Sequence, residues 1–470
     1  MPLVSSSIPN LINGVSQQPA ALRLASQAEK VINCMPSPVE GLKKRPPFQH
    51  VKKILTGSAG TGRPFIRIVD RDSTIRYMVM IRDQSIKVYD LDGTEKTVAT
   101  PDGVSYLDVG ASTDPSAAFR MASVADYSFI VNREKVAAMA ADLSPVWGYK
   151  GMVFIRSAEY STTYRIKVNG TEVAYTTAAA GGTVPDTVTI ASNLAGTLAT
   201  STGLNPAATA PTTSAVGSAT TAVFASTTGI AVGQYLTDAS GHITKGARVT
   251  NVTSTTVTFS PAANAVIQNN VVVTFHAANY VVEATDYIVR ISKADGTDYT
   301  LASADTKTGE ATVPIKGVVS SIADLPTIAE HGFTVMVQGT SETNTDDYYV
   351  KFVASAGSGF GPGVWKETVA PGIQYKLDAT TMPHVLVRET SGNFTFRKFV
   401  WGERIAGDAS TASNPSFIGS SINNVTLFRN RLTLLADENV IMSASDAYER
   451  FFPETVQTVV DSDPIDLSTG

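Results

Sequence analysis

Short runs rich in β-branched and aromatic residues dominate this sequence from residue 65 onward, and no helical period separates them. In the first part of the chain they occupy residues 65–69, 77–81, 86–89, 127–133 and 164–170. Two connections carry the pairs Asp92-Gly93 and Asn169-Gly170, which are strong signals for tight hairpins. Strands at this spacing predict an all-β protein, built as a sandwich or a propeller.

Residues 1–55 have a different character, because seven prolines interrupt them. Proline breaks helices, so this segment has room only for a short helix near residues 20–33. Apolar anchors are sparse here, and independent folding is not expected. We predict an extended N-terminal arm, which lies across a neighbour's surface or is disordered.

The middle of the chain is almost uncharged, since Asp186 is the only charged residue between Val173 and Thr237. Ala, Thr, Ser and Gly fill this stretch, and we interpret residues 195–215 as a flexible linker. The short alternating runs that follow predict a small β-sandwich, inserted at residues 206–278. The alternative is a hydroxyl-rich decorative loop.

Strand runs resume after residue 280 and are more closely spaced in the last part of the chain. They match about two blades of a β-propeller, a fold that needs roughly 4–8 blades to protect its edges. We therefore expect a multidomain, partial β-propeller-like assembly, completed by further polypeptide or covered by partner chains. We divide the chain into an extended N-terminal arm (1–55), a β-rich domain with the first propeller-like strands (56–150), a β-rich platform (151–205 plus 279–375), the inserted β-sandwich (206–278) and propeller blades (376–470).

The charge balance narrows the possible functions. The formal net charge is −5, whereas tight DNA or RNA binding usually requires a clustered basic face. Cys34 is the only cysteine and the five histidines are scattered, so each is expected to be a surface or core residue rather than a metal ligand. The sequence shows neither a secretory signal nor a long apolar run, so we expect no membrane span.

Two glycine-rich segments invite a nucleotide-binding interpretation, and both lack an essential residue. Residues 57–64 approach a phosphate-binding loop, but Arg63 and Pro64 replace its Lys and its Ser or Thr. Residues 357–363 have a proline at the third fingerprint position and strands on both sides, so we interpret them as a loop.

Other residues that could carry chemistry have simpler explanations. We interpret Asp461, Asp463 and Asp466 as turn and cap residues, in preference to a glycosidase acid pair or a cation site. Trp365 and Trp401 are assigned to cores rather than to sugar stacking. We therefore expect no catalytic, metal-binding or cofactor-binding residue and no enzymatic activity.

Several motifs occur in an order and spacing that together are specific. They are Gly-Val-Ser-Gln-Gln-Pro at 14–19, Glu-Gly-Leu-Lys-Lys-Arg-Pro-Pro at 40–47, Val-Ala-Asp-Tyr-Ser-Phe-Ile-Val-Asn-Arg at 124–133, Asp-Tyr-Tyr-Val at 347–350, Pro-Ser-Phe-Ile-Gly-Ser-Ser-Ile-Asn-Asn at 415–424 and Asp-Pro-Ile-Asp at 463–466. In these motifs the chain resembles the podovirus tail nozzle family (tail tubular protein B). The module near residues 205–280 has no recognised counterpart there.

The resemblance implies a structural protein of the virion tail, made in the host cytoplasm. It would form a homohexameric ring below the tail adaptor (tail tubular protein A-like) ring of a short-tailed phage. Its bore would pass genomic double-stranded DNA during ejection through the host envelope, and its outside would help hold the tail fibres. A closed ring suits this role because its interfaces leave no sticky edges.

The resemblance also leads to a site hypothesis and leaves alternatives open. We expect Lys43, Lys44 and Arg45 to make a charged contact between the arm and a neighbouring subunit or the adaptor; the alternative is a solvated basic turn. A different class of function is a tail adhesin or polysaccharide-degrading tailspike, with the Thr/Ser-rich insert as its binding part. A third possibility keeps the nozzle role and makes the insert a fibre-docking or host-surface domain.

Overall fold

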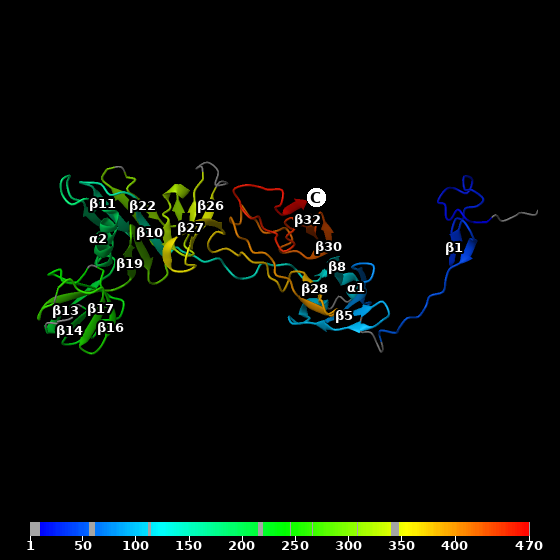
Figure 1. Cartoon of the computed structure of the whole chain (residues 1–470), viewed down its shortest axis with the longest axis horizontal. Coiled ribbons are helices and arrows are strands. Elements are labelled where there is room, and N and C mark those ends of the chain that lie inside the picture. The colour runs from blue at the N-terminus through cyan, green and yellow to red at the C-terminus, as the bar shows by residue number, and fades with distance from the viewer. Residues whose placement is uncertain are drawn as a thin grey trace, which may run out of the picture.

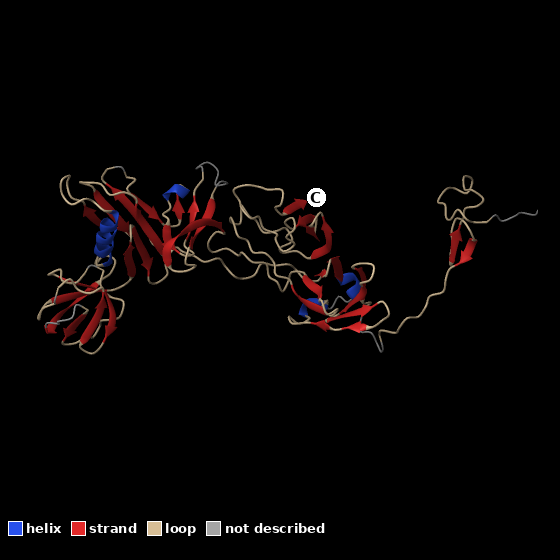
Figure 2. Cartoon of the chain, viewed as in Figure 1, coloured by secondary structure: helices blue, strands red, loops and turns tan. Residues whose placement is uncertain are grey.

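The computed structural model describes residues 10–55, 62–110, 114–214, 220–244, 246–265, 267–307, 309–339 and 347–469. Figure 1 shows an elongated arrangement, with the N-terminal hairpin at one end and the inserted module at the other. Two groups of sheets lie between them, joined by extended segments. Nearly all regular structure in the described residues is strand (Figure 2), which confirms the all-β, multidomain prediction.

Three small sheets form the group nearer the arm. The first contains, in order, β3 (Phe65–Asp70), β4 (Arg76–Arg82), β5 (Ser85–Asp90) and β6 (Glu95–Lys96). The second has the order β7 (Val98–Ala99), β29 (Phe394–Lys398), β28 (His384–Arg388), β9 (Tyr127–Asn132) and β8 (Phe119–Val124). The third contains β30 (Ile422–Phe428), β31 (Arg431–Ala436), β32 (Asn439–Met442) and β33 (Ile465–Ser468). The short helices η1 (Ser105–Leu107) and α1 (Pro115–Ala118) lie in the connection from β7 to β8.

The second sheet joins distant parts of the sequence, because β28 pairs with β9 and places Val385 opposite Phe129. Its core contains a stacked histidine: the His384 ring lies 4.0 Å from the Tyr106 ring and 5.5 Å from the Phe396 ring, centroid to centroid. Burial lowers the pKa of His384 to about 4, so the side chain is neutral at neutral pH. His384 is thus one of the core histidines that the scattered pattern predicts.

The predicted hairpins are present. Strands β3, β4, β5 and β9 coincide with four predicted runs, and β11 (Thr163–Val168) coincides with a fifth. The turn after β11 has positive φ at both central residues, 44° at Asn169 and 87° at Gly170. This is the backbone that a type I′ turn requires, and Asn-Gly is the pair that adopts it most readily.

Three more sheets and one helix form the platform. The first sheet has the order β19 (Tyr280–Thr285), β20 (Ile288–Lys293), β10 (Lys150–Ile155) and β22 (Thr312–Ile315). A three-stranded sheet contains β12 (Thr171–Thr176), β11 and β21 (Leu301–Asp305). The third has the order β23 (Val318–Val319), β25 (Thr334–Val337), β26 (Tyr348–Ala354), β27 (Phe360–Thr368) and β24 (Ile328–Glu330), with η3 (Ile322–Asp324) between β23 and β24 in the chain.

Helix α2 (Thr187–Ala199) completes the platform core. Asp186 caps it, because its carboxylate accepts the backbone N–H of Thr189 at 2.8 Å. Ile190, Leu194 and Leu198 lie one turn apart and are buried among platform strands. The flexible linker predicted at residues 195–215 is therefore wrong, since this stretch holds the end of α2 and a complete strand.

That strand, β13, opens the inserted module. The module contains β13 (Ala207–Ser214), β14 (Thr221–Phe224), β15 (Tyr235–Asp238), β16 (Arg248–Val252), β17 (Thr256–Ser260) and β18 (Val272–His276). The predicted small strands are present, but the predicted sandwich is wrong, because these strands close into a barrel. Strand β18 pairs with both β13 and β15, which leaves no sheet edge among the six. Phe224, Phe259 and Phe275 fill the interior.

Two local predictions are also corrected. Residues 357–363 were expected to form a loop, yet β27 begins at Phe360 and pairs Gly363 with Ala354. A Cβ on Gly363 would lie 2.2 Å from the carbonyl oxygen of Val353, so glycine permits this close approach. Residues 20–33 form turns and one isolated bridge rather than a short helix.

Candidate assembly surfaces

The N-terminal arm is organised by one hairpin. Strand β1 (Cys34–Ser37) pairs with β2 (Gly41–Lys44), and the turn ends at Gly41, whose φ is +74°. In the described residues the hairpin pairs with no third strand. A two-stranded hairpin alone is only marginally stable in water. The arm therefore needs contacts beyond its own backbone pairing to hold this conformation firmly.

The arm exposes many apolar side chains. Val39 is 92% exposed, Phe48 is 87% exposed and Leu22 is 68% exposed. Further large apolar residues that are exposed on the arm are Val15, Leu24, Ile32, Met35, Leu42 and Val51. Exposed apolar surface that gathers in one segment marks an interaction site in a soluble protein.

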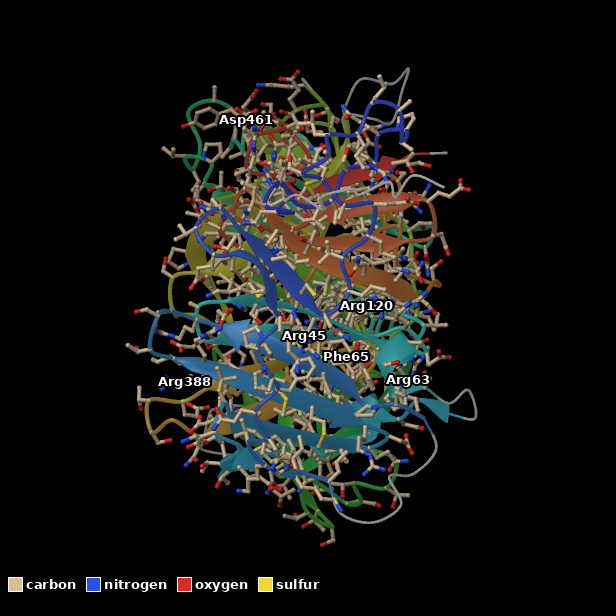
Figure 3. All side chains as sticks on the ribbon, turned by 90° about the vertical axis from the view of Figure 1, so that its right-hand side faces the viewer. Arg45, Arg63, Phe65, Arg120, Arg388 and Asp461 are labelled. Atoms are coloured by element: carbon tan, nitrogen blue, oxygen red, sulfur yellow. The ribbon has the colours of Figure 1, made fainter. Side chains whose placement is uncertain are left out.

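The three residues of the site hypothesis lie at the end of β2. Lys43 forms an ion pair with Glu40 across the turn, and Lys44 is exposed. The Arg45 side chain donates from Nε to Asn33 at 3.2 Å and lies 4.1 Å from the Phe48 ring centroid. Figure 3, seen from the arm end, shows Arg45 in front of the strands that carry Phe65. The run is accessible to another molecule.

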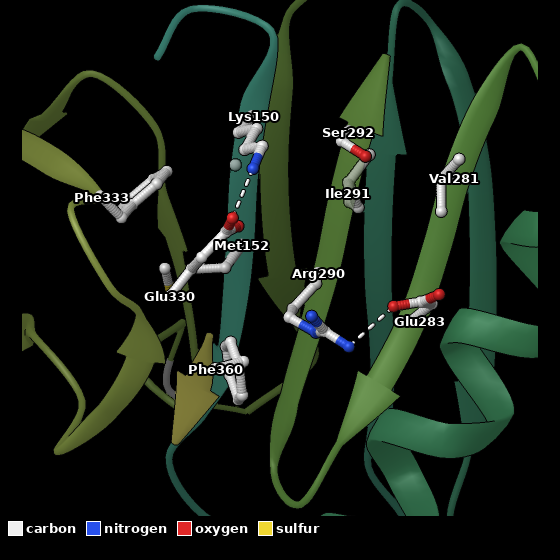
Figure 4. A pocket seen from close by; sticks show the side chains of 11 residues that line it. Lys150, Met152, Val281, Glu283, Arg290, Ile291, Ser292, Glu330, Phe333 and Phe360 are labelled. Atoms are coloured by element: carbon white, nitrogen blue, oxygen red, sulfur yellow. Dashed lines mark hydrogen bonds and ion pairs between the residues drawn. The ribbon is translucent and has the colours of Figure 1, made fainter. Parts of the chain in front are cut away.

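A polar pocket of about 180 Å³ lies between two platform sheets (Figure 4). Lys150 Nζ is 2.5 Å from a Glu330 carboxylate oxygen, and the Arg290 guanidinium is 2.7 Å from Glu283. Arg290 also lies 4.5 Å from the centre of the Phe360 ring. Each cation of the pocket is matched by a carboxylate, so the arrangement is suited to joining the two sheets.

The barrel is mounted firmly on the platform. Tyr235 of β15 is fully buried, and its hydroxyl accepts the backbone N–H of Val282 at 2.7 Å. Arg248 of β16 lies 3.3 Å from Glu283, the same carboxylate that Arg290 contacts. These contacts fix the orientation of the barrel relative to sheet β19–β20–β10–β22. Sequence reasoning missed these contacts because Tyr235, Arg248 and Glu283 come from separate segments of the chain.

An apolar pocket of about 390 Å³ lies between the second sheet of the group nearer the arm and the loop that joins β32 to β33. We call it the aromatic pocket and define it by Tyr127, Phe129, Phe399, Val400 and Tyr448. The Phe129 ring is 5.1 Å from Phe399 and 6.1 Å from Tyr448, centroid to centroid. Val400, at its mouth, is 78% exposed. Sequence reasoning missed this pocket because its walls come from three separate segments.

The aspartates of the C-terminal segment have structural contacts. The Asp463 carboxylate accepts the N–H of Val460 at 2.9 Å, and the Asp466 carboxylate accepts the N–H of Ser416 at 2.7 Å. The Asp463 contact spans three residues and fits the turn interpretation, whereas Asp466 lies on β33 and holds a segment 50 residues away. Among the described residues, no group of three or more His, Cys, Asp and Glu is placed to hold a metal ion.

The two tryptophans that the sequence assigns to cores can be placed in the structure. Trp365 donates from Nε1 to the Pro326 carbonyl at 2.7 Å, and Trp401 packs against Phe399 and Phe451 in a core. Residues 57–61 of the phosphate-loop-like motif lie outside the described residues. In the part of the chain that the structure describes, no helix is long and apolar enough to cross a membrane.

Comparison with known proteins decides the family. The sequence model of the family described as bacteriophage nozzle protein matches residues 1–470. This chain belongs to that family. Tail tubular protein gp12 of Escherichia phage T7 is 30% identical over 477 aligned residues, which cover 100% of this chain and 50% of that protein. The chain thus spans about half the length of the curated relative that it matches.

Membership of the nozzle family confirms the resemblance inferred from the motifs. The chain is a structural protein of a short-tailed phage and a component of the virion tail. A structural tail family agrees with the expectation that the chain is not an enzyme.

Proposed function

We propose that this nozzle-family chain forms a closed six-fold ring in the tail, conducts genomic DNA through its bore and helps to anchor the tail fibres. The arm would join each copy to a neighbouring subunit or to the adaptor ring. The observation that carries the proposal is the arm itself, which exposes large apolar side chains and a basic run and makes few contacts with its own body. Such a segment suits exchange between the copies of a ring.

The charge distribution supports a conduit. Residues 10–55 contain seven Lys and Arg against two Glu, whereas the whole chain has a net charge of −5. The arm is therefore +5, and the rest of the chain is −10. An acidic body repels the DNA backbone and would let DNA slide past without binding.

The sheet architecture bears on the alternatives. A polysaccharide-degrading tailspike is expected to contain a parallel β-helix, but most strand pairs in the described residues are antiparallel. We propose that the three small sheets formed by β3–β9 and β28–β33 are blades of the partial propeller. We also propose that the rigidly mounted barrel faces outward and binds fibres or other tail proteins. The division of the chain into five parts belongs to this proposal, with the barrel in place of the inserted sandwich.

Neutralising the basic run tests the role of the arm. Replacing Lys43, Lys44 and Arg45 together by Gln should reduce ring formation about tenfold, because the arm loses three of its charges. Ring formation is measured by electron microscopy of the purified protein. Attachment of the protein to tails is the second measurement. The control changes Arg23 and Lys30 to Gln, which removes two charges from the part of the arm that precedes β1. Intact rings and normal tail attachment in the first variant would show that the basic run makes no essential contact.

A further inference from the structure

Charge is concentrated with opposite sign at the two ends of this sequence. The arm, residues 10–55, has a net charge of +5. Residues 431–469 contain eight Asp and Glu against two Arg, a net charge of −6, while residues 62–135 are nearly balanced. Arg431 and Asp463 are both buried, so the remaining charged residues of this segment keep a net charge of −6. Segment 431–469 is thus electrostatically complementary to the arm.

The acidic segment also borders an apolar pocket. Tyr448, which lines the aromatic pocket, lies between Asp446 and Glu449 in the sequence, and Asp446 is exposed. The positive group at the pocket is Arg397, whose guanidinium donates to the Lys398 carbonyl at 3.1 Å. An apolar hollow to which a segment of net negative charge contributes suits an apolar side chain that is flanked by basic residues.

The arm contains one such side chain. Phe48 is the only aromatic residue of segment 10–55, and Arg45, Lys52 and Lys53 flank it. It is 87% exposed in the chain to which it belongs. Aromatic side chains that fill a pocket on the partner are common centres of protein interfaces.

The direction of the arm favours a second copy as the partner. The Lys52 side chain lies against Gly93 of its own first sheet. Before that point the chain leads away from its own body, and the hairpin stands apart in Figure 1. A segment that leaves its own subunit and matches a distant surface of the same chain produces a heterologous contact, which forms a ring when the rotation between successive copies closes.

We propose that the arm of one copy docks on the acidic segment 431–469 of the next copy, with Phe48 inserted into the aromatic pocket beside Tyr448. This inference rests on the proposed ring and specifies the surface that receives the arm. The basic run at 43–45 then faces the acidic segment 431–469. Each subunit would both give an arm and receive one.

Disulfide trapping tests the contact directly in the whole protein. Cys34 is the only cysteine, so Cys34→Ser gives a cysteine-free background. One sample of that background carries Phe48→Cys and a second carries Tyr448→Cys. Mixing them under mild oxidation should give a cross-linked pair of chains about tenfold more abundant than in either sample alone. Phe428→Cys, an exposed position on β30 that does not line the pocket, replaces Tyr448→Cys as the control.

Charge reversal provides a second measurement that does not depend on disulfide geometry. Changing Lys43, Lys44 and Arg45 to Glu should lower the cross-link yield about tenfold, and changing Asp446 and Glu449 to Lys in the partner should restore it. Cross-linking that is no better than the Phe428→Cys control, with no effect of charge reversal, would overturn the inference. The inference would also be overturned if, in a chain that carries both Phe48→Cys and Tyr448→Cys, the disulfide formed only within that chain and never between two chains.

Electron microscopy of the same mixtures separates the two proposals. Rings without the cross-link would reject this docking site and leave the ring proposal standing. Cross-linked chains without rings would support the docking site and count against the closed ring.

Discussion

Replacing Arg431 by methionine should lower the local free energy of unfolding of the third sheet by about 3–5 kcal/mol. Arg431 is buried at the start of β31 and donates to three backbone carbonyls. The acceptors are Ser443 at 2.8 Å, Asp463 at 2.6 Å and Asp461 at 2.5 Å. Methionine fills similar volume but leaves these carbonyls without their donor. Hydrogen exchange of the amides in β31 and β32 reports the loss locally.

The neighbouring arginine is the matched control. Arg429 is exposed in the turn between β30 and β31, where its guanidinium lies 5.4 Å from the Phe428 ring centroid. Arg429→Met removes the same charge but no buried hydrogen bond, so the effect should stay within about 0.5 kcal/mol. Equal effects of the two substitutions would show that the three carbonyl contacts do not organise this sheet.

Replacing Gly363 by alanine should destabilise the platform sheet by about 3 kcal/mol, the upper end of the usual cost of overpacking, because the new Cβ has no space. It would lie 2.2 Å from the Val353 carbonyl oxygen and 2.8 Å from the Ala354 Cα, and both are backbone atoms of the paired strand β26. This clash is relieved only if β26 and β27 separate, and their separation breaks the backbone hydrogen bonds between the two strands. The measurement is the denaturant dependence of hydrogen exchange in these two strands.

The same strand contains its own control. A Cβ on Gly361, two residues earlier on β27, would meet no atom within 4 Å. Gly361→Ala should therefore be neutral or slightly stabilising, because alanine restricts the unfolded chain more than glycine does. If Gly363→Ala were tolerated as well as Gly361→Ala, the tight approach of the two strands would be disproved.

The positions of many strands could be predicted from the sequence, whereas the closure of the barrel and the pairing of distant strands could not. The hairpin at Asn169-Gly170 follows from turn chemistry that acts within a few residues. The barrel depends on β18 pairing with both β13 and β15, which no local pattern encodes. Composition misled the prediction at residues 195–215, where Leu198 continues the apolar stripe of α2 in a stretch that resembles a linker.

The candidate site was predicted only in part. The basic run at 43–45 was visible as a charge cluster, and the structure finds it accessible at the end of β2. The aromatic pocket could not be predicted, because β9, the segment after β29 and the loop holding Tyr448 meet only in the folded chain. Periodicity identifies Phe129 as a core residue, but it does not identify the open space beside it.

The copy number of this protein in purified virions tests the central claim most directly. Quantitative mass spectrometry against the portal protein is the measurement. A six-fold nozzle ring below a twelve-fold portal predicts one copy of this chain for every two portal subunits. A clear excess over the portal would instead indicate spikes arranged around the tail, and would contradict the proposal that this chain forms the conduit.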